Sequence, residues 1–349
     1  MKAESILTFS AVGDTYLAGI RRWPDGYFVL ADEEIGKKAL NKVASYFLNS
    51  DVNFCNLEGV ITNSGRPIAG KSNAYLLSYP GMTRILKKAG INVVALANNH
   101  ILDYRWEALA DTMARLDKVG IKYSGAGKNL AEARKPAIIE KEGMTIGLLS
   151  YTTNLNLPMG FKASERKPGL NPIRISPFFV PDHINKEDIE VMQEDISKWH
   201  KNTDFLAISC HWGVSDQGTQ TVARHQEIIA HYAVDAGADM VIGHHTHALQ
   251  PIELYKGKAI AYSLGNFSLS LSSYQSEGII MQCVFSKNHK IKEFKFLPLY
   301  INKNNQPAVV SPEEEDGKKV VELMQKLCTQ YDVTLKVKLE TNAVIFSAQ

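Results

Sequence analysis

Six apolar runs recur along the chain and limit what it can fold into. They span residues 6–14, 52–59, 91–100, 144–152, 204–213 and 240–247. Continuous apolar runs of this kind are typical of strands buried on both faces, as in the parallel sheets of α/β proteins. Strands of this type need other elements packed against both of their faces, because each face must be shielded from water.

Helical patterns fall between these runs. In residues 105–120, apolar side chains recur at positions 106, 109, 113 and 116, and Gly120 is a suitable end for the helix. The same order of helix, glycine, short link and apolar run occurs around Gly90 and Gly237. The pattern predicts repeated αβ units and therefore an α/β fold.

The pattern changes after His247. Alternating apolar and polar residues, with turns that contain Gly or Asn, predict antiparallel strands. Ser311 and Pro312 then open a segment with acidic residues in its first turn, which predicts a helix followed by a final strand. We therefore expect one domain over residues 1–300 and a C-terminal appendage, residues 301–349, packed on it.

Two polar stretches, residues 63–79 and 154–182, predict loops. Loops of this length in a compact domain are usually functional or mobile. Each stretch is therefore either a plain surface excursion or a lid that faces the substrate, and the sequence favours neither.

Composition excludes several function classes. Basic residues number 39 and acidic residues 37, a net charge of +2, which argues against nucleic-acid binding. The four cysteines form no CxxC pair and are expected to be small core residues. The N-terminus lacks an apolar leader and no window has transmembrane length. This predicts no membrane segment and a cytoplasmic location, or envelope association if a leader or anchor has been removed.

Residue types that bind metals stand where the chain leaves the predicted strands. Strand carboxyl ends are where open α/β sheets build their sites. Each residue alone could be a turn residue, a cap or a hydrogen-bonded core histidine, but their recurrence at five strand ends is hard to reach by chance. The residues are Asp14, Glu58, Asn99, His100, Asp103, His211, His245 and His247.

Carboxylates, an amide and imidazoles, without a thiolate, are ligands for a catalytic divalent metal such as Zn, Mn or Fe. Such a metal lowers the pKa of its bound water from about 15.7 to about 7, and two metals about 3.5–4 Å apart can hold the attacking and leaving oxygens. We therefore expect one or two divalent metal ions and hydrolysis with metal-bound hydroxide as the nucleophile.

Periodicity separates the three histidines of the "GHHTH" stretch, residues 243–247. In an extended chain, residues two apart point to the same side and neighbours point to opposite sides. His245 and His247 are therefore expected to share the metal centre. His244 is expected to face away from it and to have a supporting or structural role.

Together, the motifs resemble the CapA-type proteins of poly-γ-glutamate capsule biosynthesis, a branch of the calcineurin-like metallophosphoesterases. The motifs are "GD" at 13–14, "NLEG" at 56–59, "NNHILD" at 98–103, "HWG" at 211–213 and "GHHTHALQPIELYKGKAIAYSLGNF" at 243–267. They run in order through most of the chain, and the last block is highly specific. The resemblance implies a four-layer α/β/β/α sandwich with a two-metal centre at one edge.

The resemblance also implies roles for the ligand-type residues. Glu58 would bridge two metals, Asp14 would bind one of them, and Asn99 would bind the other with His211. His100 would donate a proton to the leaving group. The remaining members of the set are Asp103, which would orient the donor, and the ligands His245 and His247.

The sequence departs from the broader phosphoesterase pattern at several positions. The usual Asp-x-His motif lacks its histidine, because Tyr16 stands two residues after Asp14, so the first metal loses a ligand. Glu58 replaces a bridging aspartate, which is the CapA-like pattern. Thr246 stands where proline is common and Ser215 where an acid is common. We therefore expect one tightly held metal and one labile metal.

Two functions follow from the resemblance. The first is a metal-dependent hydrolase of a phosphoester, or of a γ-glutamyl amide, linked to a capsule or cell-envelope polymer. The second is a non-catalytic polymer-binding or assembly component of a capsule synthesis system that keeps the fold. Retention of the ligand-type residues favours the hydrolase, and other capsule synthesis proteins are its expected partners.

Overall fold

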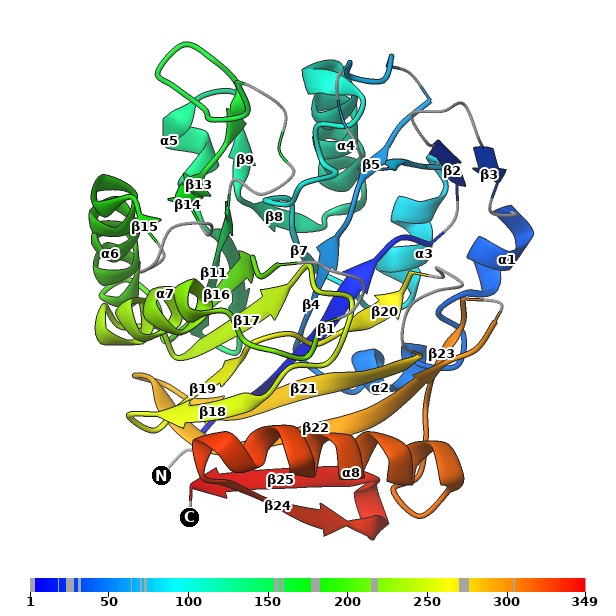
Figure 1. The fold of residues 1–349 in the computed structure, drawn as a ribbon, viewed down its shortest axis with the longest axis vertical. Helices are drawn as coiled ribbons and strands as arrows, with labels where there is room; N and C mark the ends of the chain where they lie inside the picture. The colour runs from blue at the N-terminus through cyan, green and yellow to red at the C-terminus, as the bar shows by residue number, and fades with distance from the viewer. Residues whose placement is uncertain are drawn as a thin grey trace.

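Two β-sheets carry the six apolar runs (Figure 1). The structure is a computed structural model that describes residues 4–17, 19–22, 28–30, 33–63, 65–69, 71, 74–153, 157, 160–176, 183–214, 219–269, 276–303 and 305–348. The first sheet runs in the order β24 (Val333–Lys338), β25 (Ala343–Ala348), β22 (Lys290–Ile301), β21 (Glu277–Ser286), β1 (Ile6–Thr15), β4 (Val52–Leu57), β7 (Val93–Ala95) and β8 (Lys122–Ser124). Two short strands pair with β1 and β22, namely β20 (Asn266–Ser268) and β23 (Pro307–Val309).

The second sheet runs in the order β10 (Ala137–Lys141), β11 (Met144–Thr153), β16 (Phe205–His211), β17 (Met240–His244), β19 (Lys258–Ala261) and β18 (Ile252–Tyr255), with β13 (Pro172–Ile173) beside β11. Strands β11, β16, β17 and β19 are parallel, as are β1, β4, β7 and β8 in the first sheet. The carboxyl ends of parallel neighbours meet at one edge of a sheet, so polar residues that end these strands are brought together.

The main core lies between the two sheets. Phe9 and Phe54 of the first sheet and Ile146 and Phe205 of the second are buried in one apolar cluster. The rings of Phe9 and Phe205 lie 5.3 Å apart between centroids, so the two sheets are in direct contact. Val12 of the same strand β1 belongs to the cluster on the opposite face, which confirms that this strand is buried on both faces.

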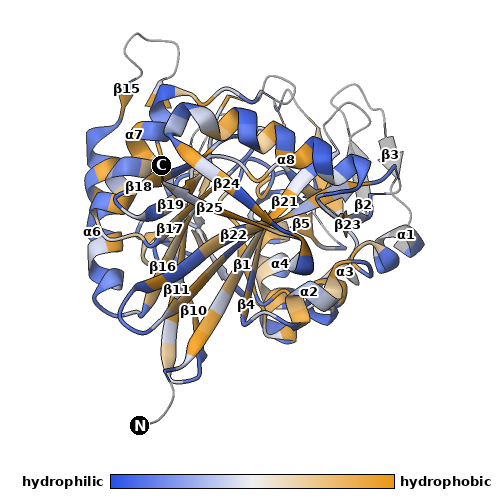
Figure 2. Ribbon diagram, turned by 90° about the horizontal axis from the view of Figure 1, so that it is seen from below, coloured by the Kyte–Doolittle hydropathy of each residue, from blue (hydrophilic) through white to orange (hydrophobic). Residues whose placement is uncertain are grey.

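Helices cover the outer face of each sheet. Helices α2 (Ala44–Leu48), α3 (Met82–Lys88) and α4 (Arg105–Val119) pack on the first sheet, and α6 (Lys186–His200) and α7 (Arg224–Asp235) pack on the second. Figure 2 shows the strands rich in hydrophobic residues inside and helices of mixed hydropathy around them. The layer order is therefore α/β/β/α, and the predicted fold class is confirmed.

No described helix is long and apolar enough to cross a membrane.

The C-terminal residues extend the first sheet. Helix α8 (Glu315–Cys328) begins after the predicted start at Ser311 and Pro312, because residues 312–313 form a turn first. Two strands follow the helix, β24 and β25, where the sequence predicted one. Val320 and Met324 of α8 belong to the cluster between the sheets, so the helix closes one end of that core.

Short strands occupy parts of both predicted loops. Strand β6 (Tyr75–Ser78) pairs with β5 (Val60–Ile61) and with β2 (Gly19–Arg22), which pairs in turn with β3 (Phe28–Leu30). In the second stretch lie β12 (Gly169–Leu170), β13 and β14 (Ile175–Ser176), the first paired with β9 (Ala126–Gly127) and the last with β15 (His183–Ile184). The rest of each predicted loop lies partly outside the described residues.

The remaining elements are α1 (Glu33–Lys38), α5 (Leu130–Ala133) and the 3-10 turns Thr329–Tyr331 and Leu339–Thr341.

The cysteines are core residues, as predicted. Cys55, Cys210, Cys283 and Cys328 are buried and free of disulfides.

Two glycines let a backbone segment pass between the sheets at the ends of β1 and β17. A Cβ atom on Gly13 would lie 1.9 Å from the backbone oxygen of Gly265, and a Cβ atom on Gly243 would lie 1.9 Å from that of Tyr262. The backbone N–H of Asp14 donates to the Gly265 oxygen at 3.1 Å. The "GD" and "GH" motifs therefore combine a close backbone approach with a polar residue directly after it.

Gly13→Ala is expected to lower the free energy of unfolding by about 1–3 kcal/mol, because the atom in its way is backbone and cannot rotate aside. Denaturant unfolding measures the change. Gly257→Ala is the matched control: no atom of the described residues lies within 4 Å of its added Cβ, and its φ is +74°. The control should cost only the positive-φ strain of about 1–2 kcal/mol. An unchanged stability of Gly13→Ala would contradict the close approach.

Candidate metal centre

The first sheet contributes two buried carboxylates. Asp14 lies in β1 and Glu58 directly follows β4, and their exposed fractions are 0% and 1%. Asp14 is held in place: the Asn56 side-chain amide donates to its Oδ1 at 2.7 Å, and the backbone N–H of His245 donates to its Oδ2 at 3.1 Å. Among the described residues, neither carboxylate oxygen of Glu58 has a hydrogen-bond partner. A buried carboxylate without hydrogen-bond partners is costly to ionise, so Glu58 stands out among the buried polar groups.

The second sheet contributes buried histidines. His211 ends β16, and its Nε2 lies 2.8 Å from Oδ1 of Asn99, which follows β7. The rings of His211 and His245 lie 4.7 Å apart between centroids. In the part of the chain that the structure describes, neither ring nitrogen of His245 has a hydrogen-bond partner. His245 therefore offers a free lone pair beside His211.

His247 joins the two sheets. Its Nδ1 lies 3.3 Å from Oδ2 of Asp14 and 3.0 Å from Oδ1 of Asn266, and its Nε2 lies 3.7 Å from Oε1 of Glu58. Ligand-type atoms of Asp14, Glu58 and His247 all lie within 4.8 Å of one another. Residues far apart in sequence thus form one compact group of donors.

The charged groups of this centre shift one another's pKa values. Burial would raise the pKa of Asp14, but the hydrogen bond and charge of His247 hold it well below its usual range. Burial, and then the charge of Asp14, raise the pKa of Glu58 to about 8. Burial opposes the charged form of His247, but Glu58 and Asp14 raise its pKa to about 9. Burial lowers the pKa of His245 to about 3, which keeps that imidazole neutral, as a metal ligand must be.

His100 and Asp103 form a hydrogen-bonded pair at the rim of this group. His100 Nδ1 lies 2.7 Å from Asp103 Oδ2, and its Nε2 lies 3.7 Å from Oε1 of Glu58. The geometry assigns the ring proton to Nδ1, which donates to Asp103. Burial, and then the charge of Lys71, lower the pKa of His100 to about 4. The neutral ring therefore presents Nε2 to the centre.

The prediction that His244 faces away from the centre was wrong, whereas its supporting or structural role stays a prediction. This residue shares the inner face of β17 with Ile242, and its Nδ1 lies 3.6 Å from Oδ1 of Asp14. Strand alternation does not extend past it, because β17 ends at His244. The chain then bends, with φ of 96° at His245 and 55° at His247. The bend, and not the period of two, brings His245 and His247 to the centre.

Sequence reasoning missed three residues that contact the predicted ones. Asn56 and Asn266 lie inside the "NLEG" and "GNF" motifs, so their place in the motifs could have indicated them. Lys71 contacts His100 and Asp103 but lies in a polar stretch with no pattern that distinguishes it. Ser215, where an acid is common, lies outside the described residues.

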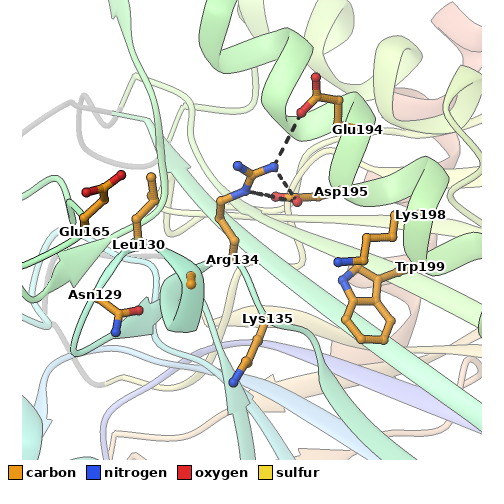
Figure 3. A pocket seen from close by; sticks show the side chains of 10 residues that line it. Asn129, Leu130, Arg134, Lys135, Glu165, Glu194, Asp195, Lys198 and Trp199 are labelled. Atoms are coloured by element: carbon orange, nitrogen blue, oxygen red, sulfur yellow. Dashed lines mark hydrogen bonds and ion pairs between the residues drawn. The ribbon is translucent and has the colours of Figure 1, made fainter.

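A separate cavity of about 660 Å³ lies between α5 and α6 (Figure 3). Arg134 contacts Asp195 through two nitrogens, with Nε–Oδ2 at 2.9 Å and Nη2–Oδ1 at 2.8 Å. None of the predicted site residues lines this cavity. Its buried carboxylate is already paired, so it shows no comparable need for a cation.

A second group of ligand-type residues, His200, Asp239 and His289, lies near the amino end of β17. Asp239 accepts from Lys258 Nζ at 2.6 Å and from His289 Nδ1 at 2.5 Å. Since a lysine already neutralises its only carboxylate, this group suits a cation less well than the centre around Glu58.

Comparison with known proteins identifies the family. A family model described as bacterial capsule synthesis protein PGA_cap matches residues 8–270. This chain belongs to that family. The matched residues contain all of the motifs, from Gly13 to Phe267, so the resemblance drawn from those motifs is confirmed.

Individual relatives and one solved structure are similar to this chain. It is 27% identical to the PGA biosynthesis protein CapA of Bacillus subtilis over 338 residues, 96% of this chain and 81% of that one. It is 33% identical to a probable polyglutamine synthesis accessory protein of Mycobacterium tuberculosis over 220 residues, 62% of this chain and 55% of that one. It is similar to a 5'-nucleotidase precursor from Thermus thermophilus, with a TM-score of 0.46 and 14% identity over 92% of this chain and 59% of that one.

The residues of the PGA_cap centre fit a divalent cation. Glu58 offers two buried oxygens and His245 two buried nitrogens that make no hydrogen bond within the described ranges. Buried carboxylates beside neutral imidazoles, with no thiolate, suit Mn, Zn or Fe. The residues that would hold the metal are Asp14, Glu58, Asn99, His211, His245 and His247.

Proposed function

We propose that this PGA_cap chain is a metal-dependent hydrolase of a phosphoester, or of a γ-glutamyl amide, in capsule or cell-envelope polymer metabolism. Glu58 is the observation that carries the proposal. Its carboxylate is buried, makes no hydrogen bond to any described residue, and lies 3.7 Å from both His100 and His247. Keeping such a group is costly unless a cation satisfies it.

The metal supplies Lewis-acid stabilisation of an ester oxygen and a lowered pKa for water when it is bound. Asp14 and Glu58 supply the negative charge that holds it. Asn56 and the backbone N–H of His245 fix the Asp14 carboxylate, so its oxygens need no reorganisation on binding.

His100 would protonate the leaving group. Its Nε2 faces the centre while its Nδ1–H is held by Asp103. An anionic ester beside Nε2 favours the imidazolium and raises the pKa of His100, because opposite charges stabilise each other. The ring can then donate from Nε2 to the leaving oxygen, with Asp103 fixing its orientation.

A second candidate is an assembly component without catalytic activity, working with other capsule synthesis proteins. The Mycobacterium tuberculosis relative, which is described as a probable accessory protein of polyglutamine synthesis, supports it. So does Tyr16, which stands where the Asp-x-His pattern needs a histidine. Both candidates keep the fold, and only the hydrolase needs His100.

Metal content and turnover test the proposal together. The purified protein should hold at least about one equivalent of Mn, Zn or Fe, and a chelator should remove it with loss of stability, since binding free energy adds to folding free energy. Hydrolysis of p-nitrophenyl phosphate and of γ-glutamyl-p-nitroanilide is then measured with and without added Mn²⁺. Bound metal without turnover of either compound favours the assembly component. No bound metal and no gain with Mn²⁺ rejects the metal centre.

A further inference from the structure

The turn between β21 and β22 connects the first sheet to the second. The backbone N–H of Asn288 donates to Oδ1 of Asp204 at 3.2 Å, and that of His289 donates to the Asp204 backbone oxygen at 2.9 Å. Asp204 directly precedes β16, which ends at His211. Because His211 is at the other end of that strand, the turn lies away from the metal centre.

Both ring nitrogens of His289 face hydrogen-bond acceptors. Its Nδ1 lies 2.5 Å from Oδ2 of Asp239, and its Nε2 lies 3.0 Å from the backbone oxygen of His200. Asp239 also accepts from Lys258 Nζ at 2.6 Å and from the backbone N–H of Leu206 at 2.9 Å. A carbonyl oxygen has no proton to donate, and a carboxylate paired with an ammonium stays ionised. Each ring nitrogen of His289 must therefore donate, so this geometry requires the doubly protonated ring.

The surroundings of His289 favour the charged ring. The side chain of Asp239 is 0% exposed and that of His289 is 17% exposed, so water and salt screen their interaction little. Burial opposes the charged form of His289, but its hydrogen bond to Asp239 raises its pKa above the usual value. The charge of Lys258 acts against the charged ring and is the weakest of these effects.

The ring of His200 stacks on that of His289, with 3.8 Å between the centroids. Burial, and then the charge of His289, lower the pKa of His200, so the second imidazole stays neutral beside the first. The charged and titratable groups around the His289–Asp239 pair are His200 of α6, Asp204 before β16, Lys258 of β19 and the buried Cys283 of β21.

We propose that His289 forms a pH-sensitive link between the two sheets, made while its ring carries both protons and broken when the ring loses one. The link consists of the two ring contacts, to Asp239 and to the backbone oxygen of His200. Loss of either proton turns a donor into a lone pair that faces an acceptor, so at least one contact becomes repulsive. None of the predicted site residues takes part, so the link does not rest on the proposed function.

The sign of the pH dependence follows from the raised pKa of His289 in the folded protein. The folded state holds the proton more tightly than the unfolded chain, in which the pKa of a histidine is about 6.5. The stability that the link contributes is therefore complete below about pH 6.5 and is lost as the pH rises through the folded pKa.

The first measurement is the titration of His289 in wild type, read from the ring ¹⁵N chemical shifts by NMR. The titration midpoint should lie above about 6.5, the value of an ordinary histidine, and both nitrogens should carry a proton below it. His289→Gln identifies the signals, because it removes them from the spectrum. A midpoint at or below about 6.5 would overturn the proposal.

The second measurement is the melting temperature of His289→Gln, which keeps a neutral donor but cannot become charged. At about pH 6 it should melt about 2–6 °C below wild type, because hydrogen bonds to charged groups are the stronger ones. At about pH 9 the difference should fall below about 1 °C, since wild type has then lost the proton. His183→Gln is the matched control, because His183 is an exposed histidine of β15, and it should match wild type at both pH values. A deficit of equal size at both pH values would show a contact that no proton controls and would overturn the proposal.

Hydrogen exchange of wild type decides the question if His289→Gln does not fold. The amides of Asn288 and His289 are held by Asp204 only while the turn stays on the second sheet. Their protection, corrected for the intrinsic exchange rate, should fall as the pH rises from about 6 to about 9, because the link breaks over this range. Constant protection would overturn the proposal. Metal content and turnover of His289→Gln should equal those of wild type, so failure of the hydrolase proposal leaves this test unaffected.

Discussion

Glu58→Gln is expected to lower the affinity for Mn²⁺ by more than about 100-fold, beyond the 10–100-fold loss typical of residues that only support a ligand. The substitution keeps the shape of the side chain but removes the charge of a buried carboxylate whose two oxygens accept no hydrogen bond from the described residues. Isothermal titration calorimetry on protein stripped of metal measures the affinity. In parallel, Mn²⁺ should raise the melting temperature of wild type and leave that of Glu58→Gln unchanged, because only a ligand that binds the folded state stabilises it.

Glu253→Gln is the matched control for Glu58. Glu253 is partly buried, with its side chain 13% exposed, and it is already paired, with His231 Nε2 at 3.0 Å and the Tyr262 hydroxyl at 2.6 Å. Its substitution should leave Mn²⁺ affinity at the wild-type value. Wild-type affinity in Glu58→Gln itself would show that the metal, if any, binds elsewhere.

His100→Ala is expected to lower kcat about 10²–10⁴-fold for a substrate with a poor leaving group, the usual contribution of a general acid. The bound metal should stay at the wild-type level, because His100 is not among the six proposed ligands. Steady-state kinetics and elemental analysis of the same preparation measure the two quantities. An unchanged kcat would remove His100 from the reaction.

His231→Ala is the control for His100. His231 also lies beside a carboxylate, Glu253, but it belongs to α7 on the outer face of the second sheet. Its removal should change neither kcat nor metal content. Loss of metal in His100→Ala, in contrast, would assign His100 to the ligands and would require another proton donor.

The two variants separate binding from proton transfer. Glu58→Gln should lose metal and activity together, whereas His100→Ala should lose activity alone. An assembly component would lose metal in the first variant and show no kinetic effect in the second, since it has no turnover to lose.

Much of the architecture could be predicted from the sequence, for reasons that are local. The run that becomes β1 is apolar on both faces, and Phe9 and Val12 do belong to different clusters. Gly120 ends α4 in the left-handed conformation, with φ of 68°, as the helix pattern required. Strand period and helix stop signals act over a few residues, so they can be read without knowing the tertiary structure.

Strand β6 was not predictable in the same way. It lies in a stretch predicted as a loop and is stabilised by pairing with β2 and β5. The partner strands, and not the segment itself, decide its conformation. Strand β24, in contrast, was missed although Val333, Leu335 and Val337 alternate with polar residues, which is the local pattern of a strand.

The sequence by itself determined which chemical groups stand at the strand ends, because apolar runs set where each strand stops and glycines mark the turns that follow. Only the tertiary structure decided which of those groups meet. Asp14 and Glu58 come from one sheet and His211 and His247 from the other, so their atoms approach only when the two sheets pack. The bend after His244 and the burial of Lys71 against Asp103 likewise depend on contacts between residues far apart in the chain, which no local pattern encodes.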